Sequence, residues 1–84
     1  MIINIKNKKD LITIDLRTKQ IRYLNNWKER GLIEFISLSN DDVNGYEWLF
    51  KSAVEEEVFF NTLKEDIKNF LNIDVDINNF EVLK

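Results

Sequence analysis

The sequence contains no cysteine, no histidine and no proline, and it has only two glycines. Without cysteine, neither a disulfide framework nor a thiolate metal site can form. The missing histidine removes most other zinc and iron sites, Cys–His catalysis and the Ser–His–Asp arrangement. Gly31 and Gly45 are too few for a glycine-rich phosphate loop. We therefore expect a protein that is not an enzyme and that holds no cofactor and no metal ion.

Long apolar runs are also missing. No stretch approaches the roughly 20 apolar residues of a membrane-spanning helix. The residues after Met1 lack the apolar core and the cleavage site of a signal peptide. The absence of proline excludes proline-rich recognition modes. The simplest expectation is a cytoplasmic protein.

The length and the hydrophobic content of the chain fit one small domain. The chain has 84 residues, 44% of them hydrophobic, which predicts a single folded domain over residues 1–84. A domain of this size buries only about 60–65% of its unfolded surface, so a deep enclosed active site is not expected. Asn, Ile and Lys fill 31 of the 84 positions. Because all three have AT-rich codons, this usage indicates a low-GC bacterial genome, or a phage or mobile element within one.

The net charge of −3 hides an uneven distribution. Residues 1–30 contain eight Lys or Arg against three Asp or Glu, whereas residues 31–84 contain four against twelve. Either the two parts pack together and neutralise each other, or they present opposite faces. The second arrangement would give an acidic surface that steers a basic partner.

Apolar alternation and β-branched residues predict strands. Ile12, Ile14 and Leu16 should share one face. Residues 17–20 are favoured as a hairpin loop, but Thr18 could instead cap a helix that ends at Gly31. Residues 7–10 and 78–79 are predicted turns. The predicted strands are residues 2–5, 11–16, 21–24, 32–38, 73–77 and 80–83.

The helical region has clear start signals. Ser39 and Asp42 have the spacing of a capping box, and Leu38 and Val43 that of a hydrophobic staple. A second Ser-x-x-Glu box begins at Ser52. These signals predict helices at 40–51 and 53–71, or one long bent helix, with Asn72 as the stop. The core-facing residues should be Val43, Tyr46, Phe50 and Val54, then Phe60, Leu63, Ile67, Phe70 and Leu71. The predicted fold class is α+β, a small antiparallel sheet of about four to five strands packed against these helices.

Acidic residues cluster in the second helix. Residues 55–57 cannot converge on one metal ion, because neighbours on a helix point about 100° apart. A ridge of Glu55, Glu56, Glu65 and Asp66 would instead span about three turns and imitate the phosphates of a nucleic acid strand. Such a ridge would fit a Lys/Arg groove built for DNA or RNA.

An exposed aromatic residue is expected in the first predicted helix, beside other acids. Tyr46 and Trp48 lie two residues apart, so both cannot face the core. An aromatic next to Asp42 and Glu47 has the composition of an interface hot spot, although it could also pack on a neighbouring strand. The predicted partner-binding residues are Asp42, Glu47, Trp48, Glu55, Glu56, Glu65 and Asp66.

Two other patterns are weaker. Asp74-x-Asp76-x-Asn78 resembles the start of a calcium loop, but Asn79 replaces the required glycine and the final glutamate is missing. An amphipathic strand with acids facing water fits better. The basic N-terminal segment with Tyr23 and Trp27 could bind nucleic acid. The acidic sequence pI of about 4.9 argues against this interpretation.

No motif points to a particular family. In length, acidity, AT-rich usage and lack of catalytic residues, the chain is similar in type to small acidic inhibitors from phages and mobile elements. Anti-CRISPR proteins and the overlapping DNA mimics belong to this type. The favoured hypothesis is an inhibitor of a bacterial nucleic-acid-handling defence protein, such as a CRISPR effector. The runner-up is an immunity protein or antitoxin that caps a basic nuclease toxin. The third is a nucleic-acid-binding regulator. A homodimer remains open.

Overall fold

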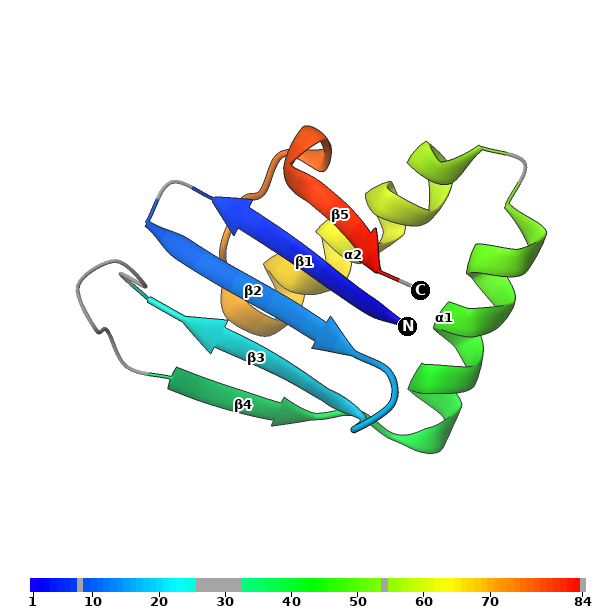
Figure 1. The fold of residues 1–84 in the computed structure, drawn as a ribbon, viewed down its shortest axis with the longest axis horizontal. Coiled ribbons are helices and arrows are strands. Elements are labelled where there is room, and N and C mark those ends of the chain that lie inside the picture. Colours follow the sequence, from blue (N-terminus) through cyan, green and yellow to red (C-terminus); the bar gives the residue numbers. More distant parts are fainter. Residues whose placement is uncertain (8, 26–32, 54, 84) are drawn as a thin grey trace.

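Strands and helices segregate into two layers in the computed structural model, which describes residues 1–7, 9–25, 33–53 and 55–83. Five antiparallel strands form one sheet in the order β4-β3-β2-β1-β5 (Figure 1). Two consecutive helices connect β4 to β5, which confirms the predicted α+β class. The strands are β1 (Ile2–Asn7), β2 (Asp10–Asp15), β3 (Gln20–Leu24), β4 (Ile33–Ser37) and β5 (Phe80–Leu83). The helices are α1 (Asn40–Ser52), α2 (Glu56–Leu71) and the short 3-10 helix η2 (Ile77–Asn79).

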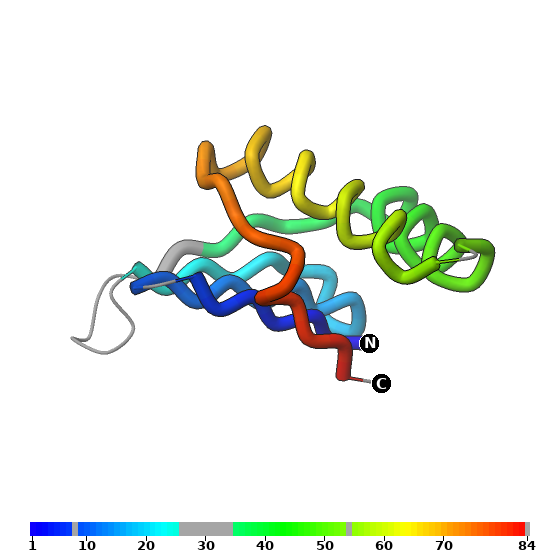
Figure 2. The backbone as a smooth tube through the Cα atoms, turned by 90° about the horizontal axis from the view of Figure 1, so that it is seen from above, coloured from blue at the N-terminus to red at the C-terminus, as the bar shows by residue number. Residues whose placement is uncertain are grey.

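Figure 2 shows α2 lying over one face of the sheet. Both views place α1 beside the strand ends at which the two chain termini lie. The core is the layer between α2 and the sheet, and the isoleucines of β1 to β3 supply much of it. As predicted, Ile12, Ile14 and Leu16 are all buried. The buried hydrophobic residues are Ile3, Ile5, Ile12, Ile14, Leu16, Ile21, Leu38, Val43, Tyr46, Phe59, Leu63, Ile67 and Val75.

The hairpin predicted after β2 is confirmed. Asp15 pairs with Gln20 at the end of the β2–β3 ladder. Lys19 adopts a left-handed conformation with φ of 57°, which lets the loop close. The competing helix is therefore wrong over residues 18–25. Its remainder, with Trp27 and Gly31, lies outside the described residues.

Helix α1 begins as its sequence predicts. Asp42 N donates to Ser39 Oγ at 3.0 Å, and Ser39 N donates to Asp42 Oδ2 at 3.1 Å. These reciprocal bonds form the capping box and satisfy two backbone donors that the helix start would leave unpaired. Leu38 and Val43, the predicted staple pair, are both buried.

The second predicted capping box is wrong. Ser52 is the last residue of α1, and its hydroxyl donates to Trp48 O at 2.7 Å. The cap position of α2 is Glu55, whose side chain makes no capping hydrogen bond. The stop at Asn72 is confirmed, since Asn72 is left-handed with φ of 57°.

The predicted core face of α2 is confirmed at Leu63 and Ile67 but not at its other positions. Phe59, Leu63 and Ile67 are buried, whereas Phe60 is half-buried and Phe70 is exposed. The three buried residues are spaced four apart, so they lie on one stripe of the helix. Phe59 and Phe60 are adjacent, and the sequence alone is compatible with either of them facing the core. The stripe that packs on the sheet contains Phe59.

Residues 73–77 do not form the predicted strand. They run from the helical layer back to the sheet, and the side chains still alternate, with Val75 buried and Asp74 and Asp76 exposed. Both edges of β1 are already paired, one with β2 and one with β5, so no ladder position beside β1 remains. The predicted turn at 78–79 is part of η2, and the Asp76 carboxylate accepts from Asn78 N at 2.9 Å.

Alanine substitutions should separate the true cap from the false one. Ser39→Ala removes a capping bond and is expected to lower the free energy of unfolding by about 1 kcal/mol. Ser52→Ala, the matched control, should change it by less than about 0.5 kcal/mol, because that hydroxyl is exposed at a helix end. Urea denaturation of both variants tests this. Equal losses would contradict the assignment.

Candidate protein-binding site on the helical layer

Most of the acidic residues of the sequence lie on the two long helices and on the segment that follows them. Residues 40–76, which contain both long helices, carry ten carboxylates and three lysines. Nine of these carboxylates are exposed and the tenth, Asp66, is half-buried. Residues 1–25, which contain β1 to β3, carry six bases and two acids. Residues 40–76 therefore form an acidic helical layer, while the choice between the two charge arrangements that the sequence left open stays a prediction.

The predicted partner-binding residues divide into several places on this layer. Glu47 and Trp48 are exposed in the middle of α1, and the side chain of Trp48 is 69% exposed. Glu55 and Glu56 are exposed at the start of α2. Glu65 is exposed further along the same helix. The remaining two, Asp42 and Asp66, both line a groove between α1 and α2.

The acids of α2 do not share one face. Glu56 and Glu65 are nine residues apart in the helix, which is two and a half turns, so they point to opposite sides. Asp66 turns toward α1, where it accepts a hydrogen bond from Tyr46. A single continuous ridge is therefore not formed. The acids of α2 point in several directions, and their role in binding a partner stays a prediction.

The groove between α1 and α2 brings acidic and apolar side chains together in a volume of about 300 Å3. Each helix contributes residues four apart along one stripe. From α1 these are Asp41, Gly45 and Leu49, with Asp42 and Tyr46 beside them; from α2 they are Thr62, Asp66 and Phe70.

A hydrogen bond joins the two helices across this groove. The Tyr46 hydroxyl donates to Asp66 Oδ2 at 2.6 Å, and Tyr46 is only 8% exposed. Burial raises the pKa of Tyr46 well above its usual value, and the hydrogen bond to Asp66 and the charges of Asp66 and Asp42 add to the rise. Tyr46 therefore stays protonated and donating at neutral pH. The sequence carries no signal for this pair, since the residues are 20 positions apart.

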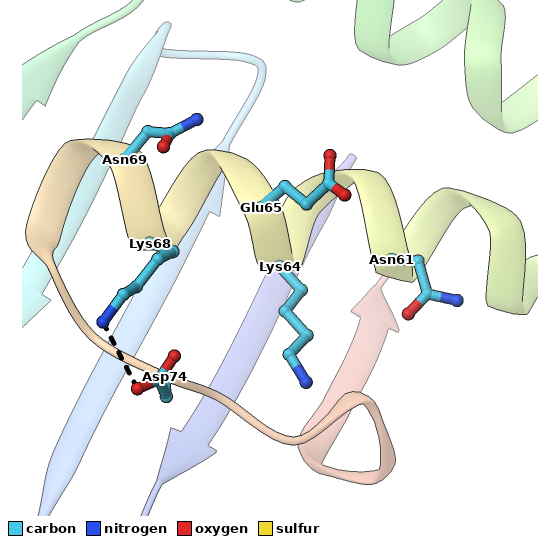
Figure 3. Close-up of a pocket in the computed structure, with 6 residues that line it drawn as sticks. All are labelled: Asn61, Lys64, Glu65, Lys68, Asn69 and Asp74. Atoms are coloured by element: carbon cyan, nitrogen blue, oxygen red, sulfur yellow. Dashed lines mark hydrogen bonds and ion pairs between the residues drawn. The ribbon is translucent and has the colours of Figure 1, made fainter.

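A second hollow, of about 580 Å3, lies along α2 near residues 72–76. Figure 3 shows Lys64 and Lys68 pointing toward this connection, whereas Glu65 points away from it. Lys68 Nζ lies 3.3 Å from Asp74 Oδ2. Two lysines balance two carboxylates among its lining residues. This hollow therefore offers no net charge to a partner.

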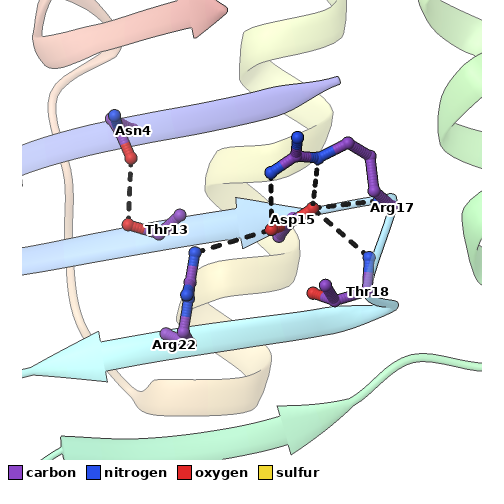
Figure 4. A network of polar contacts seen from close by, with 6 residues as sticks. All are labelled: Asn4, Thr13, Asp15, Arg17, Thr18 and Arg22. Atoms are coloured by element: carbon purple, nitrogen blue, oxygen red, sulfur yellow. Dashed lines mark hydrogen bonds and ion pairs between the residues drawn. The ribbon is translucent and has the colours of Figure 1, made fainter.

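Sequence reasoning missed a polar network on the sheet face opposite the helices (Figure 4). Asp15 is 2% exposed and accepts from the backbone N–H groups of Arg17 at 3.0 Å and Thr18 at 3.3 Å. The side chains of Arg17 and Arg22 lie 3.4 and 3.5 Å from its oxygens. An acid followed closely by turn residues is typical of an Asx turn, and that signal was present in the sequence.

The network determines the ionisation of Asp15. Burial acts to raise its pKa, but hydrogen bonds from the Arg17 side chain and from the Thr18 and Arg17 backbone outweigh burial and lower it. Asp15 is therefore a charged residue that stabilises the β2–β3 hairpin.

Comparisons with protein-family models, with curated proteins and with solved structures found no match. Among the described residues, no three carboxylates are grouped so that they could hold a metal ion. Within the same residues, no helix has the length and apolar character needed to cross a membrane.

Tyr46→Phe tests the bond between the helices. It should lower the free energy of unfolding by about 1–2 kcal/mol, since the Asp66 carboxylate loses its donor. Because folding raises the pKa of Tyr46, its contribution to stability is fully present below about pH 10 and falls above it, where the unfolded tyrosine ionises first. The phenylalanine variant should show a flatter decline. Urea titrations from neutral to alkaline pH measure both effects, and identical profiles would refute the role of this bond.

Asp15→Ala should lower the free energy of unfolding by about 1–3 kcal/mol at neutral pH, because two backbone donors lose their acceptor. Since folding lowers the pKa of Asp15, its contribution is present above about pH 4 and is lost as the pH falls through the folded value. Arg17→Gln is the matched control, expected to cost less than about 1 kcal/mol because the arginine is exposed. This role is contradicted if Asp15→Ala keeps the wild-type free energy of unfolding at both neutral and acidic pH.

Proposed function

We propose that the protein is an inhibitor that binds a bacterial nucleic-acid-handling protein through its helical layer and blocks that protein's nucleic-acid-binding surface. The observation that carries the proposal is the display of nine exposed carboxylates against three lysines over residues 40–76. A CRISPR effector is the favoured partner, met in the bacterial cytoplasm.

The physical basis is electrostatic complementarity. Surfaces that bind DNA or RNA are rich in Lys and Arg and release counterions when phosphates bind. The exposed carboxylates of α2, a helix of 16 residues and about 24 Å, present negative charge over a length that such a surface spans.

Trp48 supplies an anchor beside the charge. Its side chain is 69% exposed on α1, and Glu47 and Lys51 on the same helix are exposed as well. Tryptophan dominates binding energy at many protein interfaces because it buries a large area at low entropic cost. The acids would steer the encounter, and Trp48 would slow dissociation.

The rival partner is a basic nuclease toxin, to which the same surface would bind by the same physics. Direct binding of nucleic acid has less support. Two of the six bases in residues 1–25, Arg17 and Arg22, already pair with Asp15. Their charge is partly neutralised within the sheet layer, so that layer offers phosphates less attraction than its base count implies.

Charge reversal tests the mechanism. Glu55→Lys with Glu65→Lys should weaken inhibition of a CRISPR effector by at least tenfold, because two carboxylates that face the partner become repulsive. Asp10→Lys with Glu81→Lys is the matched control, since it changes the net charge equally on the sheet layer and should leave inhibition intact. The measurement is DNA cleavage by purified effectors from low-GC bacteria at low and high salt.

Several outcomes would overturn the proposal. Equal effects of the two double variants would show that only net charge matters, and salt-independent inhibition would remove the electrostatic mechanism. Stoichiometric binding of a neighbouring nuclease toxin, with no inhibition of any effector, would replace the favoured partner by its rival. A gel shift with free DNA or RNA at low salt would contradict a protein partner.

A further inference from the structure

The groove between α1 and α2 contains a glycine that the fold does not need. Gly45 lies inside α1, where glycine costs about 1 kcal/mol relative to alanine. Its backbone has no positive φ, and a Cβ built on it would meet nothing within 4 Å. Neither backbone conformation nor packing therefore requires glycine at this position. Gly45 keeps part of the groove empty.

The empty space has walls of two kinds. Leu49, the ring of Tyr46 and the 45% exposed side chain of Phe70 supply apolar surface. Asp41 and Asp42 from α1 and Asp66 from α2 supply negative charge. The hydrogen bonds of the groove engage one oxygen, Oδ2, of Asp42 and of Asp66. The carboxylates thus line an open groove of about 300 Å3 together with aromatic and aliphatic side chains.

Arginine has the chemistry that fits such walls. Its aliphatic stem covers apolar surface, and its planar guanidinium stacks on aromatic rings while donating to carboxylates in several directions. Contact with a ring face adds about 0.5–1 kcal/mol at an exposed site. Lysine has a compact, strongly hydrated charge and cannot stack in this way.

We propose that the α1–α2 groove is a socket for an arginine side chain that the partner protein presents. This inference rests on the proposed function, because a partner built to bind nucleic acid displays arginine on its binding surface. It adds a specific contact to the general electrostatic attraction. The socket would determine how the inhibitor is oriented on its partner, and the scattered acids would determine how fast the two meet.

The test uses three short peptides that differ only at the central residue, which is arginine, lysine or the uncharged isostere citrulline. Each is titrated into the isotopically labelled protein, and amide chemical shifts are followed. The arginine peptide should shift the amides of Gly45, Tyr46 and Asp66 first. The lysine peptide should bind several-fold more weakly, and the citrulline peptide should cause no shift in the groove.

Two substitutions at Gly45 separate the groove from the rest of the acidic layer. Gly45→Ala removes the cost of glycine and leaves most of the space, so it should bind arginine as the wild type does. Gly45→Leu fills the groove and should lower affinity at least tenfold. Both residues favour helix more than glycine does, so a loss in the leucine variant cannot come from unfolding. Thermal denaturation verifies that both variants are at least as stable as the wild type.

The proposal is overturned if Gly45→Leu binds arginine as tightly as the wild type. It is also overturned if arginine and lysine peptides cause equal shifts spread over all the acids, or if no shift appears in the groove at tens of millimolar peptide. These failures are distinct from failure of the proposed function. If inhibition persists in Gly45→Leu, only the socket is wrong. If arginine binds the groove and no partner is inhibited, the socket stands and the function is wrong.

Discussion

Phe59, Leu63 and Ile67 pack against the isoleucine face of the sheet, and every other feature of the molecule depends on this contact. All three are fully buried. Each such side chain stabilises the folded state by about 1.5–3 kcal/mol relative to exposure. The chain has no disulfide, so its stability rests on this single layer of apolar side chains. Without α2 on the sheet there would be neither a groove nor an acidic layer.

The same helix presents different residues in different directions. The stripe through Leu63 faces the sheet, and the stripe of Thr62, Asp66 and Phe70 faces the groove shared with α1. Its remaining surface carries exposed acids such as Glu65. Stability therefore comes from one side of α2, while the surfaces assigned to binding lie on the others. Substitutions on the binding surfaces can be made without removing core contacts.

Local signals in the sequence predicted much of this fold. The alternation of Ile12 and Ile14, the Ser39 capping box and the Asn72 stop all depend on residues close together in the chain. The predictions were wrong where contacts with residues distant in the sequence determine the local structure. Residues 73–77 have the alternation of a strand, but β5 already occupies the edge of β1 beside which they could pair. The Ser52 signal was misleading because α1 ends at that residue.

The candidate site was only partly visible in the sequence. The acidic composition and one exposed aromatic were predicted, and the structure shows that the exposed residue is Trp48 while Tyr46 is buried. The grouping of Asp42 with Asp66 depends on the angle between two helices, which no local pattern encodes. The open space beside Gly45 is likewise visible only in three dimensions.

The pairing of β5 with β1 has a consequence for the order of folding. Ile2 pairs with Leu83 and Ile5 with Phe80, so β1 is paired with a strand that is made much later in the chain. Until residue 83 has been added, β1 is an open edge lined by isoleucines, the kind of edge that recruits strands from other chains. Contacts this distant in sequence also form slowly. A newly made chain therefore passes through a period in which aggregation competes with the closing of its own sheet.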